Sequence, residues 1–194
     1  MPSLPARIQS RLSCYYGIAE APPVDDFIDT SGDEREALLI RDREVDVEIS
    51  LRLPRSAQGG RGRPNFDELC QIIEGVSHFL YVAERVRREL PATQLELELQ
   101  AEIDKYILFA HDTGFDPGRA ARIRRILFDR VRFLHPIGTE PGDRYRMANH
   151  LAARFAGKLE SSYARHGRFE QMRTTLRRFY GAGQTEKIEL ARAA

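Results

Sequence analysis

From Pro64 onward the apolar residues of this chain recur at spacings of three and four, which is the period of an amphipathic helix. Two segments, 65–68 and 93–96, place an N-cap residue three positions before a Glu, and this capping box is typical of a helix start. The first apolar stripe is formed by Phe66, Leu69, Ile73, Val76, Leu80 and Ala83. The sequence therefore predicts helices that begin near Asn65 and Thr93.

Three more helices are expected in the C-terminal part of the chain. Asp116 followed by Pro117 is an N-cap with a first-turn proline, which opens the first of the three. Their expected ranges are 117–134, about 141–165, and 169–180. The residues after Gly183 are interpreted as a short polar tail.

The N-terminal part shows strand patterns instead. Residues 45–53 alternate apolar and polar side chains without a fault, which predicts a strand with one buried face. Residues 37–40 precede it across a polar turn, so a β-hairpin is expected. Because two strands alone are marginally stable in water, residues 14–18, with two tyrosines and an isoleucine, are expected to supply a third.

The stretch 55–64 lacks apolar periodicity and is rich in glycine, which indicates a flexible linker or loop. The expected domains are then a β-rich segment over 1–54 and a helical domain over 65–194. The predicted fold class is α+β and mainly α, with an N-terminal β-hairpin or small antiparallel sheet packed on a bundle of about five helices.

Charge is divided between the two ends of the chain. Residues 1–116 carry 13 Lys and Arg against 22 Asp and Glu, whereas residues 117–194 carry 17 against 7. Two oppositely charged parts can neutralise each other inside one assembly, or the basic part can bind a polyanion. Arginine outnumbers lysine 27 to 3, a ratio that a GC-rich bacterial genome also produces, so only the position of the charge is informative.

Arg122, Arg125 and Arg132 are expected on one side of the helix over 117–134, which makes them candidate binding residues. Helical arginine stripes neutralise phosphates, but they also dock onto acidic protein surfaces. The sequence has no helix-turn-helix signature, zinc finger or aromatic RNA-binding motif beside them. Nucleic-acid binding through 117–134 and 144–178 is therefore the alternative hypothesis rather than the first.

Glu74 and His78 lie one helical turn apart on the face opposite the apolar stripe. A carboxylate and an imidazole at that spacing can share a proton or begin a metal site, but nothing nearby in the sequence completes one. The other four histidines stand in no HxxxH or HExxH arrangement. We therefore expect a solvated polar face here, with no metal and no cofactor.

Glu102 falls inside the apolar arc of its own predicted helix. A carboxylate at such a position must be paired, protonated or at the rim of the core. We predict an ion pair with an arginine of the C-terminal half or a hydrogen bond to a tyrosine, and a Glu102 side chain less exposed than those of Glu96 and Glu98. A catalytic acid with a shifted pKa is the minor alternative.

The sequence contains no motif that fixes a chemistry: no GxSxG, no phosphate-binding loop and no dinucleotide-binding GxGxxG. Its two cysteines stand far apart, and no apolar run is long enough to span a bilayer, which favours a cytoplasmic protein. The leading hypothesis is a non-catalytic binding or adaptor protein that contacts a protein partner or a second copy of itself. An enzyme of unknown class is the third hypothesis.

Overall fold

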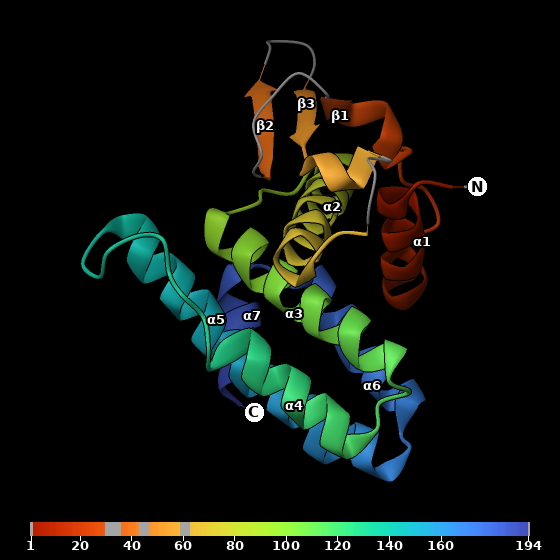
Figure 1. Ribbon diagram of the computed structural model, residues 1–194, viewed down its shortest axis with the longest axis vertical. Coiled ribbons are helices and arrows are strands. Elements are labelled where there is room, and N and C mark those ends of the chain that lie inside the picture. Colours follow the sequence, from red (N-terminus) through yellow and green to blue (C-terminus); the bar gives the residue numbers. More distant parts are fainter. Residues whose placement is uncertain (1, 30–35, 43–46, 59–62, 194) are drawn as a thin grey trace. The chain divides into compact units, whose positions relative to one another are not determined.

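The computed structural model describes residues 2–29, 36–42, 47–58 and 63–193 (Figure 1). The chain forms two units, one made of Met1–Cys14 with Ile18–Pro91 and the other of Tyr15–Gly17 with Ala92–Ala194. Helices dominate the described residues and the sheet has three strands, so the predicted mainly helical α+β fold class is confirmed. Of the helices described, none combines the length and the apolar character needed to cross a membrane.

The first unit combines the sheet with two α-helices. Its strands are ordered β1-β3-β2, with β2 antiparallel and β1 parallel to the central β3. The elements are α1 (Leu4–Tyr16), the 3₁₀ turn η1 (Val24–Phe27), β1 (Ile28–Asp29), β2 (Ala37–Asp42), β3 (Val47–Arg52), the 3₁₀ turn η2 (Arg55–Gln58) and α2 (Phe66–Arg87).

The predicted hairpin is present as β2 and β3. Their register pairs Leu38 with Leu51 and Ile40 with Ile49, while residues 43–46, where the predicted turn falls, lie outside the described residues. Leu51 and Leu53 are completely or almost completely buried, as the alternating pattern predicts for one face of a strand.

The strand predicted over 14–18 is wrong, because these residues end helix α1 and follow it. Ile8, Leu12 and Tyr16 recur every four residues and are all buried, so the helical period outweighs the strand preference of the two tyrosines. The third strand is β1, whose two residues are too few to produce a recognisable alternation.

The second unit is helical throughout its described residues. Its elements, besides the end of α1, are α3 (Gln94–Asp112), α4 (Pro117–Phe128), α5 (Glu140–Lys158), the π-helical turn η3 (Leu159–Tyr163), the 3₁₀ turn η4 (Ala164–His166), α6 (Phe169–Gly181) and α7 (Gln184–Arg192). Helix α5 packs against α3, α4 and α7. The Phe155 ring of α5 stacks on the Phe179 ring of α6 at 4.2 Å between centroids, and both rings are fully buried.

The division between the units falls after Pro91, whereas the sequence placed a linker at 55–64. Helix α2 groups with the sheet because Gly75 brings its backbone against β3: a Cβ atom there would lie 3.1 Å from Leu51 Cδ1 of β3 and 2.6 Å from Cδ2 of Leu53, which follows the strand. Part of the expected linker, Arg55–Gln58, forms the turn η2, and residues 59–62 lie outside the described residues.

Two predicted features of the second unit are wrong. Helix α4 ends at Phe128 rather than Leu134, because the side-chain amide of Asn149 on α5 binds the Phe128 carbonyl at 3.1 Å and the chain then turns along α5. The expected polar tail is helix α7. This helix has no long apolar stripe. Its buried residues include Lys187, although lysine side chains are usually exposed to solvent.

Both predicted capping boxes are present at the starts of α2 and α3. Asn65 Oδ1 accepts a hydrogen bond from the Glu68 amide at 3.0 Å, and Thr93 Oγ1 accepts one from the Glu96 amide at 3.2 Å. Replacing either cap by alanine is expected to lower the free energy of unfolding by about 1 kcal/mol. Urea denaturation checks this, with Asn65→Asp as the control that keeps an acceptor; two alanine variants as stable as the wild type would contradict it.

Candidate functional site

Exposed apolar side chains gather where α4 ends and α5 begins. Among the described residues ten large apolar side chains are exposed, and five of them lie between positions 126 and 147. They are Ile126, Val131, Leu134, Ile137 and Met147, and we call this region the α4–α5 corner. Leu134 is 69% exposed and Ile137 is 78% exposed, which is unusual for side chains of this kind outside an interface.

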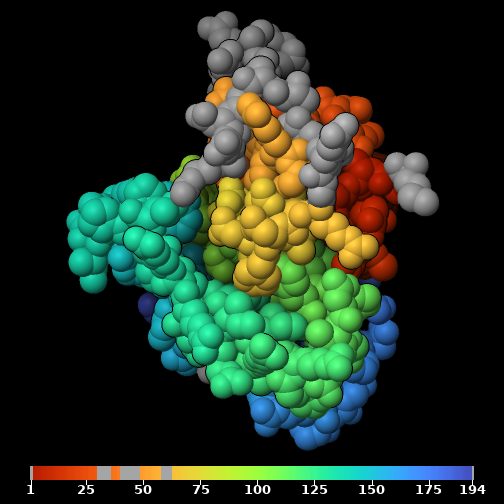
Figure 2. Space-filling view, viewed as in Figure 1, coloured from red at the N-terminus to blue at the C-terminus, as the bar shows by residue number. Residues whose placement is uncertain are grey.

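The loop over residues 129–139 runs back along the first turns of α5, and this corner projects from the other helices of its unit (Figures 1 and 2). Arg146 of α5 donates to the His135 carbonyl at 3.1 Å, and its guanidinium lies 4.6 Å from the Phe133 ring centre. The His135 ring stacks on Tyr145 at 5.7 Å. The loop is therefore held by α5 at several points while Leu134 and Ile137 face solvent.

The end of this loop depends on Gly142 in the first turn of α5. A Cβ atom at this position would lie 1.9 Å from the Pro136 carbonyl oxygen and 2.7 Å from Thr139 Oγ1. Thr139 caps α5, accepting from the Gly142 amide at 3.2 Å and donating to the Pro136 carbonyl at 2.7 Å. The absence of a side chain at residue 142 lets the loop lie against the helix start.

The three arginines selected from the sequence are all exposed, but they do not form one helical stripe. Arg122 and Arg125 lie on α4, whereas Arg132 lies in the loop, because α4 ends before it. Within the part of the chain that the structure describes, none of the three makes an ion pair. Residues 117–150 carry eight arginines against three acidic residues, so the corner and its surroundings are basic.

Several other arginines of the second unit are engaged within that unit. Arg124 pairs with Glu160 at 3.1 Å and Arg178 with Glu186 at 2.9 Å. Arg146 and Arg154 donate to backbone carbonyls at 2.8 and 2.6 Å. The basic charge is thus partly neutralised inside the unit, and the exposed remainder includes the three arginines near the corner.

Glu102 is ion-paired with Lys105 of its own helix, whose Nζ lies 2.8 Å from Oε1, whereas the sequence prediction named an arginine of the C-terminal half. The Glu102 side chain is 20% exposed, whereas residues Glu96 and Glu98 are 3% and 5% exposed, so the predicted order of burial is wrong. Helix α3 is buried on nearly all sides, and a single apolar arc on a helical wheel therefore does not determine which carboxylates are covered.

A buried polar chain in the second unit escaped the sequence analysis. Lys187 Nζ donates to Gln100 Oε1 at 2.6 Å, and the Gln100 amide donates to Asp104 at 2.8 Å and to the Tyr16 hydroxyl at 3.0 Å. The Tyr16 hydroxyl in turn donates to Asp104, and the Tyr16 ring stacks on Tyr180 at 4.2 Å. These groups come from segments up to 171 positions apart in the printed sequence, so no local pattern predicts their meeting.

A second buried cluster surrounds Glu160 in the π-helical turn η3. Its carboxylate accepts from the Tyr106 hydroxyl and from Arg124 Nε, each at 3.1 Å. Burial, followed by the neighbouring Glu160 carboxylate, raises the pKa of Tyr106 far above its usual value. A π-helical turn often marks a functional position, but here its acidic side chain is satisfied by groups of the same unit.

The raised pKa of Tyr106 predicts a loss of stability at alkaline pH. In the unfolded chain a tyrosine ionises near pH 10, whereas folded Tyr106 keeps its proton, so the folded state binds more protons above that pH. The free energy of unfolding is therefore fully retained below about pH 10 and falls above it, by about 1 kcal/mol at pH 10.5 from this residue.

Urea midpoints at about pH 8 and pH 10.5 check the prediction, with Tyr106→Phe expected to reduce the alkaline fall. Tyr145→Phe, at a partly exposed position, is the matched control, and this variant should show the full alkaline fall in stability. An alkaline fall of the same size in the wild type and in Tyr106→Phe would contradict the assignment.

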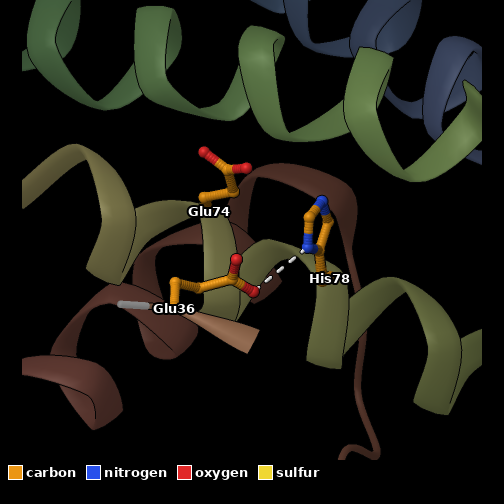
Figure 3. Close-up of side chains that lie close together, drawn as sticks. All are labelled: Glu36, Glu74 and His78. Carbon is orange, nitrogen blue, oxygen red and sulfur yellow. Dashed lines mark hydrogen bonds and ion pairs between the residues drawn. The ribbon is translucent and has the colours of Figure 1, made fainter. Parts of the chain in front are cut away.

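In the first unit, Glu74 and His78 of α2 meet a third residue, Glu36, which directly precedes β2 (Figure 3). Glu36 Oε1 lies 3.3 Å from His78 Nδ1, and one donor atom of each of the three residues lies within 4.8 Å of the others. His78 is 7% exposed, so the solvated polar face expected here is wrong. The Glu36 side chain lies against it, and Glu36 stands 38 positions before Glu74, too distant for a spacing motif.

Comparison of the chain with protein-family models, with curated proteins and with solved structures gave no match. A functional hypothesis therefore rests on the residues themselves. Two arrangements carry it: the exposed apolar and basic α4–α5 corner of the second unit, and the partly buried Glu36, Glu74 and His78 of the first.

Proposed function

We propose that this protein is a non-catalytic cytoplasmic binding or adaptor protein whose α4–α5 corner contacts a protein partner. The observation that carries this proposal is the exposure of Leu134 and Ile137 on a loop held by α5. Exposing such side chains to water is unfavourable, and apolar groups on a preorganised loop lose little conformational entropy when they are covered. The sparse use of cysteine supports the cytoplasmic setting.

The side-chain chemistry of the corner favours protein over nucleic acid. Its exposed apolar residues are aliphatic or methionine, and such side chains offer no ring on which a base can stack. Phe133 of the loop is half-buried and covered by Arg146, and the exposed His135 ring of the same loop already stacks on Tyr145. Methionine and arginine, by contrast, are enriched at protein interfaces, where apolar anchors are surrounded by charged groups.

Charge complementarity defines the kind of partner. The exposed Arg122 and Arg125 lie on α4 and the exposed Arg132 lies in the loop, so the segments that lead to the apolar anchors carry positive charge. A protein surface with carboxylates around an apolar cleft would complement both features, and the charges would accelerate association more than they strengthen the complex. The partner we propose is therefore a separate acidic protein that covers Leu134 and Ile137.

The alternative, a nucleic-acid-associated protein, is favoured by one specific observation: Arg122 and Arg125 are exposed on the same helix. A surface that neutralises six or more phosphates would bind generic DNA or RNA with an affinity that falls about a thousandfold or more between 50 and 200 mM salt. Fluorescence anisotropy with mixed-sequence duplex DNA and single-stranded RNA over that range distinguishes the two functions.

We expect weak nucleic-acid binding that the triple variant Arg122→Ala, Arg125→Ala, Arg132→Ala changes little. The matched control is Leu134→Ser with Ile137→Ser, which removes the apolar anchors and leaves every arginine in place. Tight, salt-sensitive binding that the arginine variant abolishes and the serine variant retains would replace the proposed function by its alternative.

A further inference from the structure

We propose that Glu36, Glu74 and His78 form a binding site for a divalent transition-metal ion, with Zn²⁺ and Co²⁺ as suitable probes. The site belongs to the first unit and is independent of the α4–α5 corner. It combines two carboxylates with one imidazole, a donor set that ions of the first transition row accept.

The distances between the donor atoms fit a common ion. Bonds of about 2.0 to 2.2 Å to a tetrahedral zinc ion place neighbouring donor atoms about 3.4 Å apart. Glu36 Oε1 and His78 Nδ1 are already 3.3 Å apart, and the set as a whole lies within 4.8 Å. Figure 3 shows the Glu36 carboxylate turned toward the His78 ring, with Glu74 one helical turn earlier on α2. A modest rotation of Glu74 completes the set.

The backbone holds the ligands together for identifiable reasons. Glu74 and His78 are four residues apart on α2, which places them on the same face one turn apart. Between them, Gly75 allows Glu36 to approach, because a Cβ atom there would lie 2.9 Å from Glu36 Cγ. The Glu36 amide also donates to Gln71 Oε1 at 3.4 Å, so α2 positions both the backbone and the side chain of Glu36.

Burial favours a bound ion over a simple ion pair. The side chains of His78 and Glu36 are only 9% and 13% exposed, and Glu74 beside them is partly buried as well. Two partly buried carboxylates next to each other repel unless a positive charge lies close to both of them. A divalent cation balances both carboxylates and leaves the imidazole neutral, which is the form that binds metal.

Three protein ligands leave at least one coordination position of a tetrahedral ion for water or an exogenous ligand. Structural zinc sites are usually closed by four protein ligands, with cysteine frequent among them. The geometry therefore indicates a metal site with a coordination position open to an exogenous ligand, rather than a closed structural zinc site.

Equilibrium dialysis of the full-length, metal-stripped protein against Zn²⁺ tests the proposal. We expect one ion per chain with a dissociation constant of about micromolar or tighter. Glu74→Gln and Glu36→Gln, which keep side-chain shape, should each weaken binding at least about tenfold. His78→Gln should do the same, and circular dichroism establishes that each variant is folded. The matched controls Glu89→Gln and His150→Gln, both at exposed positions, should bind as the wild type does.

Co²⁺ supplies a readout that dialysis does not. Its visible absorption reports a coordination geometry that includes protein ligands, and the spectrum should be lost or altered in folded Glu74→Gln. Zn²⁺ binding that no folded ligand variant weakens would overturn the proposal, as would a wild-type chain that binds neither ion tighter than about 100 μM. The serine variant of Leu134 and Ile137 should keep full metal binding, so failure of this site and failure of the proposed function are distinguishable.

Discussion

Phe155→Ala is expected to lower the free energy of unfolding of the second unit by about 3 to 5 kcal/mol, the largest effect we predict for stability. Phe155 is fully buried near the C-terminal end of α5, and its ring stacks on Phe179 of α6 with 4.2 Å between the centroids. Truncation to alanine removes the favourable free energy of transferring the ring from water into the core, and it removes the contact with the Phe179 ring. It also leaves a cavity whose surrounding side chains lose packing contacts. Because α5 also packs against α3, α4 and α7, the surroundings cannot easily collapse into that space.

Urea denaturation followed by circular dichroism measures this effect. Phe169→Ala is the matched control, since Phe169 opens α6 and is 41% exposed, and we expect a loss below about 1 kcal/mol there. Similar losses in the two variants would mean that α5 is not the centre of the packing in this unit.

Gly142→Ala is expected to destabilise the second unit by about 1 to 3 kcal/mol and to displace the α4–α5 loop. The added Cβ atom would lie 1.9 Å from the Pro136 carbonyl oxygen, so the loop backbone must move. Alanine is a better helix former than glycine by about 1 kcal/mol, but this gain is smaller than the cost of such a backbone clash. Because the same loop carries Ile137, partner binding should weaken together with stability.

Gly157→Ala on the same helix is a close control. A Cβ atom at residue 157 meets nothing within 4 Å, so only the helix preference remains, and we expect unchanged or slightly increased stability. Thermal unfolding of the two variants measures the contrast. If Gly142→Ala were as stable as Gly157→Ala, the loop would not lie against the start of α5 as described.

Local signals in the sequence predicted the elements that depend on neighbouring residues. The caps at Asn65 and Thr93 are hydrogen-bonded within one turn, and the sequence spacing is enough to identify them. The alternation that continues through Leu51 and Leu53 identified β3 in the same way. These features are fixed by short-range geometry, which periodicity records directly.

Features that depend on distant contacts could not be predicted in this way. Helix α7 buries Lys187, whose ammonium group binds Gln100 and lies over the Phe179 ring, so a charged residue takes a core position that no apolar stripe marks. The metal-ligand candidate Glu36 meets His78 only because β2 packs on α2. The sequence identified two members of that set, and the third required the fold.

The loop after α4 contains both a feature that the sequence predicts and one that it does not. His135 and Pro136 were recognised as ending a helical stretch, but the end itself comes at Phe128, where Asn149 binds the carbonyl. As a result Arg132 was assigned to a helix although it lies in the loop. Its exposure beside Leu134 makes it part of a mixed apolar and basic surface instead of an arginine stripe.

Site-specific photocrosslinking at position 137 in living cells shows directly whether the α4–α5 corner contacts a protein partner. A benzophenone amino acid in place of Ile137 lies on the proposed surface, and the same residue in place of Gln171, exposed on α6, is the matched control. We expect a crosslink from position 137 to a distinct acidic protein, lost when Leu134→Asp is added and not formed from position 171. A crosslink to a second copy of the chain would make the partner the protein itself. No crosslinked protein at position 137, or the same products from both positions, would refute the proposed contact.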